Sequence, residues 1–203
     1  MPTLPNDRIA RLIEPYCPEA SKLVVDQLSA YLDLLLKWNA RTNLTSIREP
    51  EEIVQRHFGE SLFAGLHLPM VQTVLDFGSG AGFPGIPIQL VRPEIQVTLG
   101  ESQNKKATFL REAVRSLELR SEVWADRIED MPHDRHFDLV AMRAVDNMAA
   151  AVKAASERAS KYMAILTTTG ASVLIAGFTL KEVIPLPGSA EKVLLIAHRP
   201  DVS

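Results

Sequence analysis

The chain has 203 residues, of which 46% are apolar, and its formal net charge at pH 7 is −3. It is long enough for one sizeable core, and its slightly acidic balance excludes a uniformly basic nucleic-acid coat protein. Cys17 is the only cysteine, so an intramolecular disulfide and a thiolate zinc cluster are excluded, and no metal site is predicted. No signal peptide or membrane-spanning run is evident, and we expect a cytoplasmic protein without membrane contact.

The N-terminal part of the chain is predicted to be helical. Apolar residues recur with helical spacing over residues 19–40, and a second helix fits residues 50–66, which begin with a proline and two glutamates. The polar segment RTNLTSIREP, residues 41–50, breaks the pattern between them. We therefore predict a helical extension over residues 1–68, packed on the remainder of the protein.

After Pro69 short apolar strands alternate with helices, which is typical of a mostly parallel sheet covered on both faces. The last two strands have no helix between them and are expected to form an antiparallel hairpin. The sequence thus predicts a doubly wound α/β domain with a seven-stranded sheet over residues 69–203. The expected strands are residues 71–77, 95–101, 121–125, 137–142, 171–177, 182–187 and 191–199, and the expected helices are residues 84–91, 103–119 and 144–163.

The stretch DFGSGAGFPG joins the first of these strands to a helix. Its alternating glycines permit positive φ and close approach to a ligand, at the sheet edge where open α/β folds bind ligands. Gly80 also starts a G-x-G-x-x-G pattern, which is typical of a dinucleotide site. However, two prolines crowd the place where a pyrophosphate needs N–H donors, and Asp76 before Gly78 suits an amine better than a phosphate.

Residues that follow the next two strands outline an adenosine ligand. Glu101 closes the second strand, where a carboxylate can accept both ribose hydroxyls of NAD or of an adenosyl ligand. Ile128 and Glu129 follow the third strand and offer one apolar and one polar contact to an adenine. Together with the acid before the glycines, these residues favour an amine-bearing adenosine. S-adenosylmethionine (SAM) has this chemistry, and NAD does not.

Four sequence blocks occur in the order WNARTNLTSIREPEEIVQRHFGESL, VLDFGSGAGFPGIP, QNKKATFLREAVRSL and FDLVAMRAV. In this order they resemble the bacterial 16S ribosomal RNA guanine-N7 methyltransferase family, also called glucose-inhibited division protein B. The first block combined with the glycine loop is specific, whereas a glycine loop alone is not. The resemblance implies an enzyme that methylates guanine 527 of the small-subunit RNA with SAM as cofactor.

The resemblance also implies roles for individual residues. Gly78 and Phe83 are expected to line the methionine and ribose side of the cofactor, and Ile128 and Glu129 to lie at the adenine. Arg143 at the end of the fourth strand is expected as a further binding position.

Methylation of guanine N7 needs alignment of the reacting atoms but no general base, because N7 has an in-plane lone pair and no proton. The five histidines have no convincing acid–base partner in the sequence and are expected to be surface or capping residues. Arg143 is the expected catalytic residue, acting by position and charge. Its partner would be the cofactor carboxylate, an RNA phosphate or the guanine O6.

The residues expected to contact RNA are Arg41, Asn43, Arg48 and Arg56, which gather around the loop between the two N-terminal helices. They make the helical extension the RNA-facing part of the protein. Basic residues on the helix at 103–119 have even odds of forming only a solvated face. The expected partner is 16S ribosomal RNA or a precursor of the small subunit, and the protein is expected to be a monomer without a stable protein partner.

Two alternatives to this function stay open at the level of the sequence. One is an NAD(P)-dependent oxidoreductase, which the proline-crowded glycine loop disfavours. The other is a non-catalytic family member that binds only ligand or RNA. It is suggested by the C-terminal third, where Ala176 stands at the place expected for a family lysine and few residues remain for a late helix.

Overall fold

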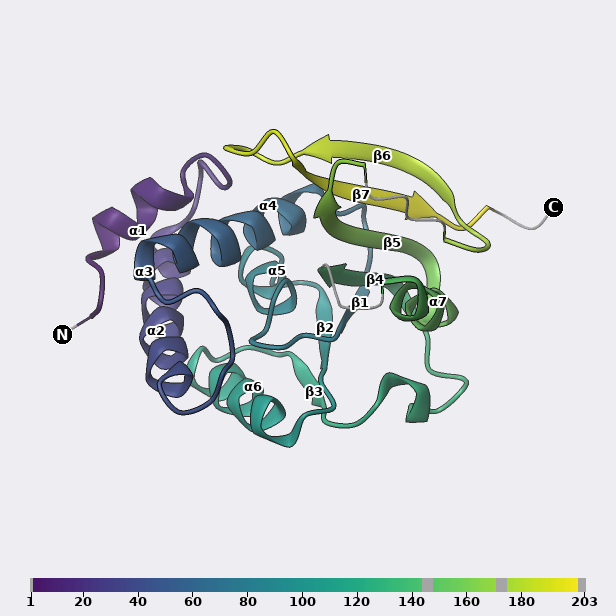
Figure 1. Ribbon diagram of the computed structural model, residues 1–203, viewed down its shortest axis with the longest axis horizontal. Helices are drawn as coiled ribbons and strands as arrows, with labels where there is room; N and C mark the ends of the chain where they lie inside the picture. Colours follow the sequence, from purple (N-terminus) through teal and green to yellow (C-terminus); the bar gives the residue numbers. More distant parts are fainter. Residues whose placement is uncertain (1, 144–147, 171–174, 201–203) are drawn as a thin grey trace.

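The centre of the molecule is a single sheet with the strand order β3-β2-β1-β4-β5-β7-β6 (Figure 1). The computed structural model describes residues 2–143, 148–170 and 175–200. Strands β1 to β5 are parallel, whereas β7 runs antiparallel to both β5 and β6. The predicted doubly wound sheet and its C-terminal hairpin are therefore confirmed. The strands are β1 (Thr73–Phe77), β2 (Gln96–Gly100), β3 (Glu122–Trp124), β4 (Phe137–Arg143), β5 (Ala159–Thr168), β6 (Thr179–Pro185) and β7 (Lys192–His198).

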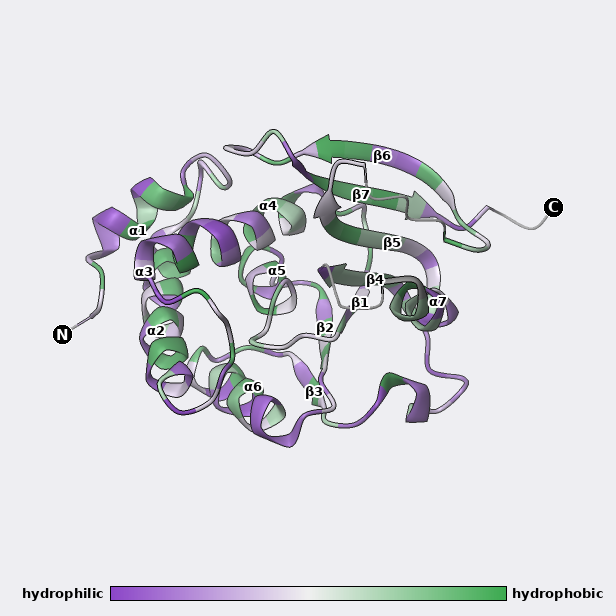
Figure 2. Ribbon diagram, viewed as in Figure 1, coloured by the Kyte–Doolittle hydropathy of each residue, from purple (hydrophilic) through white to green (hydrophobic). Residues whose placement is uncertain are grey.

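Helices cover both faces of the sheet, and their apolar sides turn toward it (Figures 1 and 2). The N-terminal helices, α5 and α6 share one hydrophobic cluster with one face, whereas α7 packs on the other. No helix in the described ranges combines the length and apolar character needed to cross a membrane. The helices are α1 (Asn6–Ile13), α2 (Lys22–Asn39), α3 (Pro50–Glu52), the π-helix η1 (Ile53–Gly59), α4 (Glu60–His67), α5 (Gly85–Val91), α6 (Asn104–Ser116), the 3-10 turn η2 (Ile128–Asp130) and α7 (Met148–Arg158).

The fifth strand lies earlier in the chain than predicted. The expected helix over residues 144–163 ends at Arg158, and β5 starts directly after it at Ala159. Residues 144–147 of that prediction, and 171–174 of the expected strand over residues 171–177, lie outside the described residues, whereas residues 175–177 are not part of a strand. Along β5, Met163 packs in the cluster on one face of the sheet and Ala164 in the cluster on the other. A strand buried on both faces shows no polar alternation, so its apolar run is easily taken for a helix.

This shift also corrects the position expected for the family lysine. β5 ends at Thr168 and is followed by Thr169 and Gly170. Ala176, which we placed at the end of the fifth strand, instead lies shortly before β6. The described residues between β5 and β6 contain no helix. The expected placement of Ala176 at the end of the fifth strand is therefore wrong.

The N-terminal helices share the core of the sheet and contact the glycine loop. Tyr31 of α2 is fully buried, its ring stacks on Phe58 at a centroid distance of 4.9 Å, and its hydroxyl donates to the carbonyl of Ala81. α2 begins after Ser21, whose hydroxyl accepts a hydrogen bond from the N–H of Val24 and so caps the helix. The predicted helical extension is thus part of the support of the loop.

The second predicted N-terminal helix is present but changes pitch in its middle. It begins as α3, continues as η1 and ends as α4. A π-helical turn is rare and occurs frequently at functional sites. η1 carries Arg56 and His57, and both residues contact Arg143 at the end of β4. The irregular turn therefore lies against the edge of the sheet.

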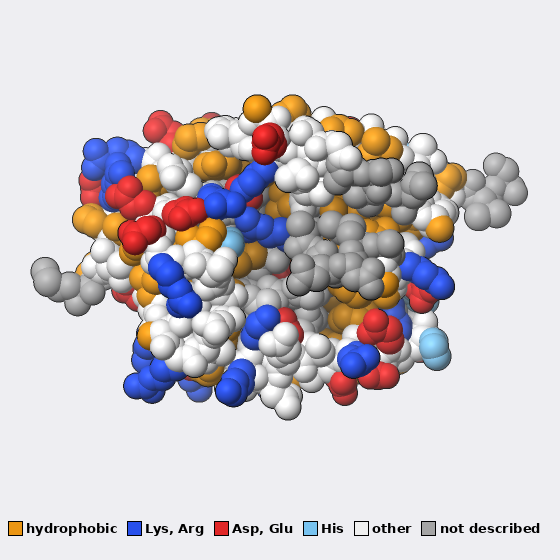
Figure 3. Space-filling model, viewed as in Figure 1, with side chains coloured by type: hydrophobic (Ala, Val, Ile, Leu, Met, Phe, Trp, Pro, Cys, Tyr) orange, Lys and Arg blue, Asp and Glu red, His pale blue; other side chains and the backbone are white. Residues whose placement is uncertain are grey.

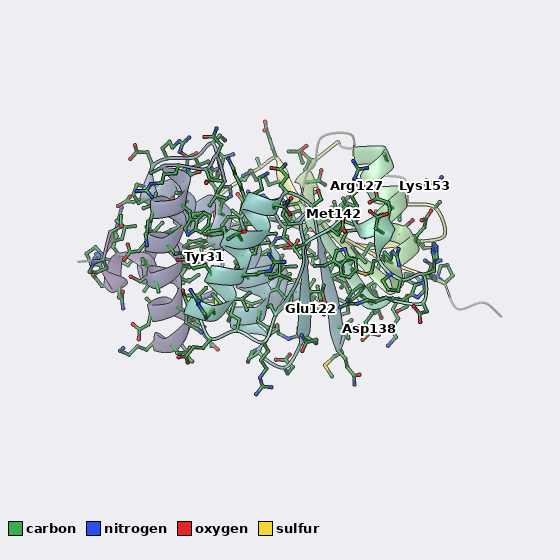
Figure 4. The ribbon with its side chains drawn as sticks, turned by 90° about the horizontal axis from the view of Figure 1, so that it is seen from below. Tyr31, Glu122, Arg127, Asp138, Met142 and Lys153 are labelled. Atoms are coloured by element: carbon green, nitrogen blue, oxygen red, sulfur yellow. The ribbon has the colours of Figure 1, made fainter. Side chains whose placement is uncertain are left out.

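Figure 4 shows which edge of the sheet this is. Met142, near the end of β4, lies toward the upper side of that view, and Asp138, near the start of the same strand, lies toward the lower side. The carboxyl ends of the parallel strands therefore point upward in Figure 4 and toward the reader in Figures 1 and 3.

Candidate active site

Two strand ends that carry predicted site residues meet at the carboxyl edge of the sheet. β1 and β4 are neighbours, with Asp76 opposite Ala141. Gly78 and Arg143 each lie two residues further on, so they come level with each other. Ligands of open parallel sheets bind beyond this edge, and the structure thus brings the glycine loop and Arg143 to the same place.

A cavity of about 270 Å³ opens beside the ends of β1 and β2. Four predicted cofactor residues line it, namely Gly78, Glu101, Ile128 and Glu129. The turns that follow β1, β2 and β3 converge here, which explains why residues far apart in the sequence share one cavity. The complete lining is Phe77, Gly78, Gly100, Glu101, Ser102, Asp126, Arg127, Ile128 and Glu129.

Glu101 is held in the cavity wall by backbone N–H groups. The side chain is buried, and its two carboxylate oxygens accept hydrogen bonds from Gly80 at 3.0 Å and from Gln103 at 2.8 Å. Gly80 does not line the cavity, so its contribution is to orient Glu101. A carboxylate has about four lone-pair positions. Glu101 therefore keeps acceptor capacity for the hydroxyls of a ribose.

Asp76 lies beneath the glycine loop and does not line the cavity. It is fully buried, and one oxygen accepts the N–H of Gly85 at 2.9 Å, while the other has no hydrogen-bond partner among the described residues. Burial raises the pKa of Asp76 to about 7. A Cβ on Gly85 would lie 2.6 Å from this carboxyl group. The hydrogen bond and close packing between Asp76 and Gly85 therefore hold the glycine loop in shape on the side away from the cavity.

Phe83 faces the N-terminal helices and is likewise outside the cavity lining. Its ring stacks on His57 at a centroid distance of 4.7 Å and lies tilted against Tyr31 and Phe58. This residue joins the glycine loop to the π-helix, so the cofactor loop and the N-terminal extension cannot move independently without breaking an aromatic cluster.

Arg143 is immobilised by three partners on η1 and α4. NH1 donates to Nδ1 of His57 at 3.0 Å, and NH2 donates to the carbonyl of Arg56 at 2.9 Å and to Oε2 of Glu60 at 3.0 Å. Three of its five N–H donors are used in this way. Burial lowers the pKa of Arg143, although a guanidinium stays charged at all physiological pH values.

His57 belongs to the site, whereas the sequence suggested a surface or capping role. Because Arg143 donates to Nδ1, we assign the proton to Nε2, which contacts the hydroxyl of Thr45 at 2.7 Å. Burial lowers the pKa of His57 to about 3, assisted by the charges of Arg143, Arg56 and Lys192. The ring is therefore neutral at physiological pH. In the sequence, the one indication that His57 belongs to the site is that it lies in the same block as Thr45, WNARTNLTSIREPEEIVQRHFGESL.

Glu60 and Lys192 are two further site residues that sequence reasoning missed. Glu60 on α4 is buried, and its Oε1 accepts a hydrogen bond from Nζ of Lys192 at 2.5 Å. Lys192 begins β7, opposite Thr168 at the end of β5. The two residues are 132 positions apart in the chain, so no local pattern could reveal their contact.

Asn39 shapes the loop on which the predicted RNA contacts lie. This buried side chain accepts hydrogen bonds from the N–H groups of Leu44 and Thr45, and its amide donates to the carbonyl of Thr45. The Trp-Asn and Asn-Leu-Thr parts of the first sequence block thus meet in space. The same loop presents the hydroxyl of Thr45 to His57.

The side chains predicted to contact RNA, Arg41, Asn43, Arg48 and Arg56, are all exposed. Arg48 is ordered by hydrogen bonds to the carbonyl of Asn39 and to Oδ1 of Asn43. Figure 3 shows Lys and Arg side chains gathered beside a His side chain, between the segments labelled α3 and β6 in Figure 1. The carboxyl edge therefore carries positive charge on the side of the N-terminal helices.

Larger hollows lie elsewhere on the molecule. One of about 660 Å³ lies on β5, β6 and β7, and one of about 890 Å³ lies between α2 and α5. Neither is lined by a predicted site residue. A third hollow, of about 410 Å³, shares Ile128 and Glu129 with the small cavity but is not lined by Gly78 or Glu101. Within the described part of the chain, no group of three or more His, Cys, Asp or Glu residues is placed to hold a metal ion. The small cavity at the strand ends is thus the candidate cofactor site.

Comparison with protein families decides between the remaining alternatives. The family model described as rRNA small subunit methyltransferase G matches residues 24–190. The chain belongs to this family. A family relative, the ribosomal RNA small subunit methyltransferase G of Xanthomonas euvesicatoria pv. vesicatoria, is 37% identical over 182 residues, which are 85% of each chain. The corresponding protein of Stenotrophomonas maltophilia is 40% identical over 174 residues, which are 80% of this chain and 81% of the relative.

Solved structures resemble this family member in fold. A mutant of MtNAS in complex with S-adenosylmethionine matches with a TM-score of 0.58 and 14% identity, over 96% of this chain and 97% of that chain. M. jannaschii TYW2 in complex with AdoMet matches with a TM-score of 0.55 and 15% identity, over 71% and 75% of the two chains. Together with family membership, this fold confirms the predicted SAM-dependent methyltransferase and leaves the oxidoreductase alternative without support.

Proposed function

We propose that this protein transfers a methyl group from SAM to N7 of a guanine, position 527, in 16S ribosomal RNA. The observation that carries the proposal is membership of the small-subunit rRNA methyltransferase G family. The cavity at the carboxyl edge and the cations beside it support the proposal. The partner is 16S ribosomal RNA or a precursor of the small subunit, on which the protein acts as a monomer in the cytoplasm.

The cavity residues fit an adenosyl ligand. Glu101 offers carboxylate oxygens for ribose hydroxyls, and Ile128, which is 6% exposed, offers an apolar surface for an adenine. Glu129 lies beside it as a hydrogen-bond acceptor. Gly78, with a φ of 71°, lets the loop pass the cavity without a side chain. When bound here, SAM supplies an electrophilic methyl group on a sulfonium.

The site residues align the reactants and exclude water, and none is needed to remove a proton. Guanine N7 carries a lone pair and no hydrogen, so it can attack a methyl group directly. Among the described residues, His57 is the histidine that hydrogen-bonds to Arg143. Its Nδ1 is occupied by that contact, and its pKa of about 3 makes it a weak base. We therefore assign His57 a positioning role.

Arg143 is the residue that we place at the reacting groups. Its guanidinium is fixed level with Gly78 and keeps its charge, so it can hold an anionic or carbonyl oxygen without reorganisation. Of its possible partners, the guanine O6 and an RNA phosphate are favoured over the cofactor carboxylate. The contacts of Arg143 with His57 and Glu60 tie it to the N-terminal helices, which form the RNA-facing side.

The RNA-facing rim consists of Arg41, Asn43, Arg48 and Arg56. All four are exposed around the loop that Asn39 shapes, and three of them are cations suited to phosphates. Phosphate contacts of this kind fix the register of an RNA without reading its sequence. The rim would therefore position the RNA without selecting a base. The guanine to be methylated would be the one that can flip out of the RNA and reach the site.

The decisive experiment is single-turnover methyl transfer by the purified protein to unmethylated 16S ribosomal RNA, followed by mapping of N7-methylguanosine. The protein is expected to use SAM and to produce one modified guanine. The same mapping in cells with and without the gene tests the function in its native setting. Loss of the gene without loss of N7-methylguanosine from 16S ribosomal RNA would contradict the proposal.

A further inference from the structure

One buried carboxylate at the carboxyl edge is shared by two cations from different strands. Glu60 is 5% exposed and pairs through Oε2 with Arg143 at 3.0 Å and through Oε1 with Lys192 at 2.5 Å. The side chains of Arg143 and Lys192 are 22% and 24% exposed. Two positive charges thus face one negative charge, and both cations keep part of their surface accessible.

Among the described residues, no carboxylate other than Glu60 pairs with Arg143 or Lys192. His57 is neutral at physiological pH and contributes no anion. Arg56, whose carbonyl accepts from Arg143, adds a further cation and pairs with Glu52 instead of joining the cluster. A partly buried cation without its own anion is unfavourable. Counted over the part of the chain that the structure describes, the cluster therefore holds one carboxylate for two cations, Arg143 and Lys192.

Lys192 lies on the side of the edge away from the adenosine cavity. It is the first residue of β7 and, because β7 is antiparallel to β5, it lies at the carboxyl edge opposite Thr168. In the sheet order β7 is three strands from β1, or about 14 Å at the usual spacing of strands. The cavity lies beside β1 and β2. A negative charge that reaches Lys192 is thus expected to belong to the RNA rather than to the cofactor.

We propose that Lys192, held beside Arg143 by Glu60, binds a backbone phosphate of the RNA strand that carries the target guanine. This proposal rests on the proposed function and assigns part of its RNA site to the C-terminal hairpin. The ammonium group is the contact, and Glu60 is a positioning residue that keeps both cations at the edge. A phosphate at Lys192 would supply the missing negative charge.

The test compares Lys192→Gln and Lys192→Arg with Lys161→Gln. Lys161 is a matched control because it is also a strand lysine paired with a carboxylate, Asp138 at 2.8 Å, but at the opposite edge of the sheet. The measurements are binding of unmethylated 16S ribosomal RNA at several salt concentrations, affinity for S-adenosylhomocysteine, and thermal unfolding of each variant.

Lys192→Gln is expected to weaken RNA binding and to lower the slope of log affinity against log salt by about 0.7 to 0.9, which corresponds to one phosphate contact. Its affinity for S-adenosylhomocysteine should be unchanged, Lys192→Arg should restore RNA binding, and Lys161→Gln should behave as wild type. A lower unfolding temperature of Lys192→Gln with an unchanged salt slope would show a purely structural ion pair and overturn the proposal. A wild-type protein that methylates no 16S ribosomal RNA would overturn the proposed function itself.

Discussion

Nδ1 of His57 accepts a hydrogen bond from Arg143 at 3.0 Å, while Nε2 of the same ring contacts the hydroxyl of Thr45 at 2.7 Å. A neutral imidazole thus connects the loop after α2 to the end of β4. Because the ring also stacks on Phe83, the loop after α2, the glycine loop and Arg143 are held in one arrangement. His57 acts through Arg143 rather than on a substrate proton.

The first prediction concerns the pH dependence of methyl transfer. With a pKa of about 3, His57 does not titrate in the neutral range, so the single-turnover rate at saturating substrates should show no ionisation of this residue there. His57→Gln should lower the rate by about 2- to 13-fold, since one neutral hydrogen bond to Arg143 is worth about 0.5–1.5 kcal/mol. The shape of the pH profile should be unchanged. A rate that rises steeply through neutral pH only when His57 is present would identify it as a general base.

The second prediction concerns the guanidinium of Arg143. Arg143→Lys keeps the positive charge but loses the planar group that donates to His57, Arg56 and Glu60 at once. The expected loss in single-turnover rate is about 10- to 100-fold, the equivalent of a charged hydrogen bond of about 1.5–3 kcal/mol. SAM affinity, measured by calorimetry, should change much less. Full activity of Arg143→Ala would show that another residue occupies the reacting centre.

The third prediction concerns the backbone of the cofactor loop. Gly78 has a φ of 71° and lines the cavity, so Gly78→Val should abolish binding of SAM in calorimetric titrations. Gly177→Val is the matched control, because Gly177 has a φ of 79° and lies outside that cavity. Both variants carry the strain of a β-branched residue at positive φ. Equal loss of SAM binding in both would mean that strain, not occupation of the cavity, is responsible.

The fourth prediction concerns the pH dependence of stability. The pKa of Asp76 is raised from its ordinary 3.8 to about 7, so the folded protein binds one more proton than the unfolded chain between these values. The stabilisation that protonated Asp76 adds to the folded protein is fully present below about pH 4 and is lost as the pH rises through 7. The unfolding free energy falls by up to about 1.4 kcal/mol per pH unit over this range. Asp76→Asn should remove the contribution of Asp76 to the unfolding free energy, measured by urea denaturation at several pH values.

His57 contributes with the opposite sign. Its pKa is lowered from 6.5 to about 3, so its contribution is present above pH 6.5 and is lost as the pH falls toward 3. Between about pH 4 and 6.5 the contributions of Asp76 and His57 to the unfolding free energy partly cancel. Asp76→Asn should therefore lose stability more steeply than the wild type as the pH falls. Asp134→Asn, at an exposed loop position, serves as the control. Identical pH dependence in wild type and Asp76→Asn would contradict the assignment.

The fifth prediction concerns the RNA-facing rim. Arg41→Ala should weaken RNA binding and lower the salt slope by about 0.7 to 0.9, as expected for one phosphate contact, without changing SAM affinity. Lys22→Ala is the control, because Lys22 is also exposed but lies at the other end of α2, about 25 Å away at 1.5 Å per residue. An unchanged slope for Arg41→Ala would mean that this arginine is only solvated.

Local sequence patterns were sufficient for the fold class and for four residues that line the candidate cavity, Gly78, Glu101, Ile128 and Glu129. The alternation of strands and helices predicts the parallel sheet, and the carboxyl ends of parallel strands necessarily meet at one edge. Gly78, Glu101 and Ile128 each follow a strand, so their convergence on one cavity follows from topology alone. The boundary between α7 and β5 was not predictable in the same way, because a strand buried on both faces lacks the polar alternation that distinguishes it from a helix.

Tertiary structure alone decided the arrangement around Arg143. Glu60, His57 and Lys192 come from a helix, a π-helical turn and the last strand, and no pattern of periodicity links them. Their roles depend on burial and distance: burial makes His57 neutral, and sharing of Glu60 holds two cations at the edge. Long-range electrostatic contacts of this kind carry no local signature, because the chain between them can have almost any sequence that folds. The sequence by itself therefore determined the fold class and the convergence of Gly78, Glu101 and Ile128 on one cavity. Only packing of the N-terminal helices and the C-terminal hairpin on the sheet determined the surroundings of Arg143.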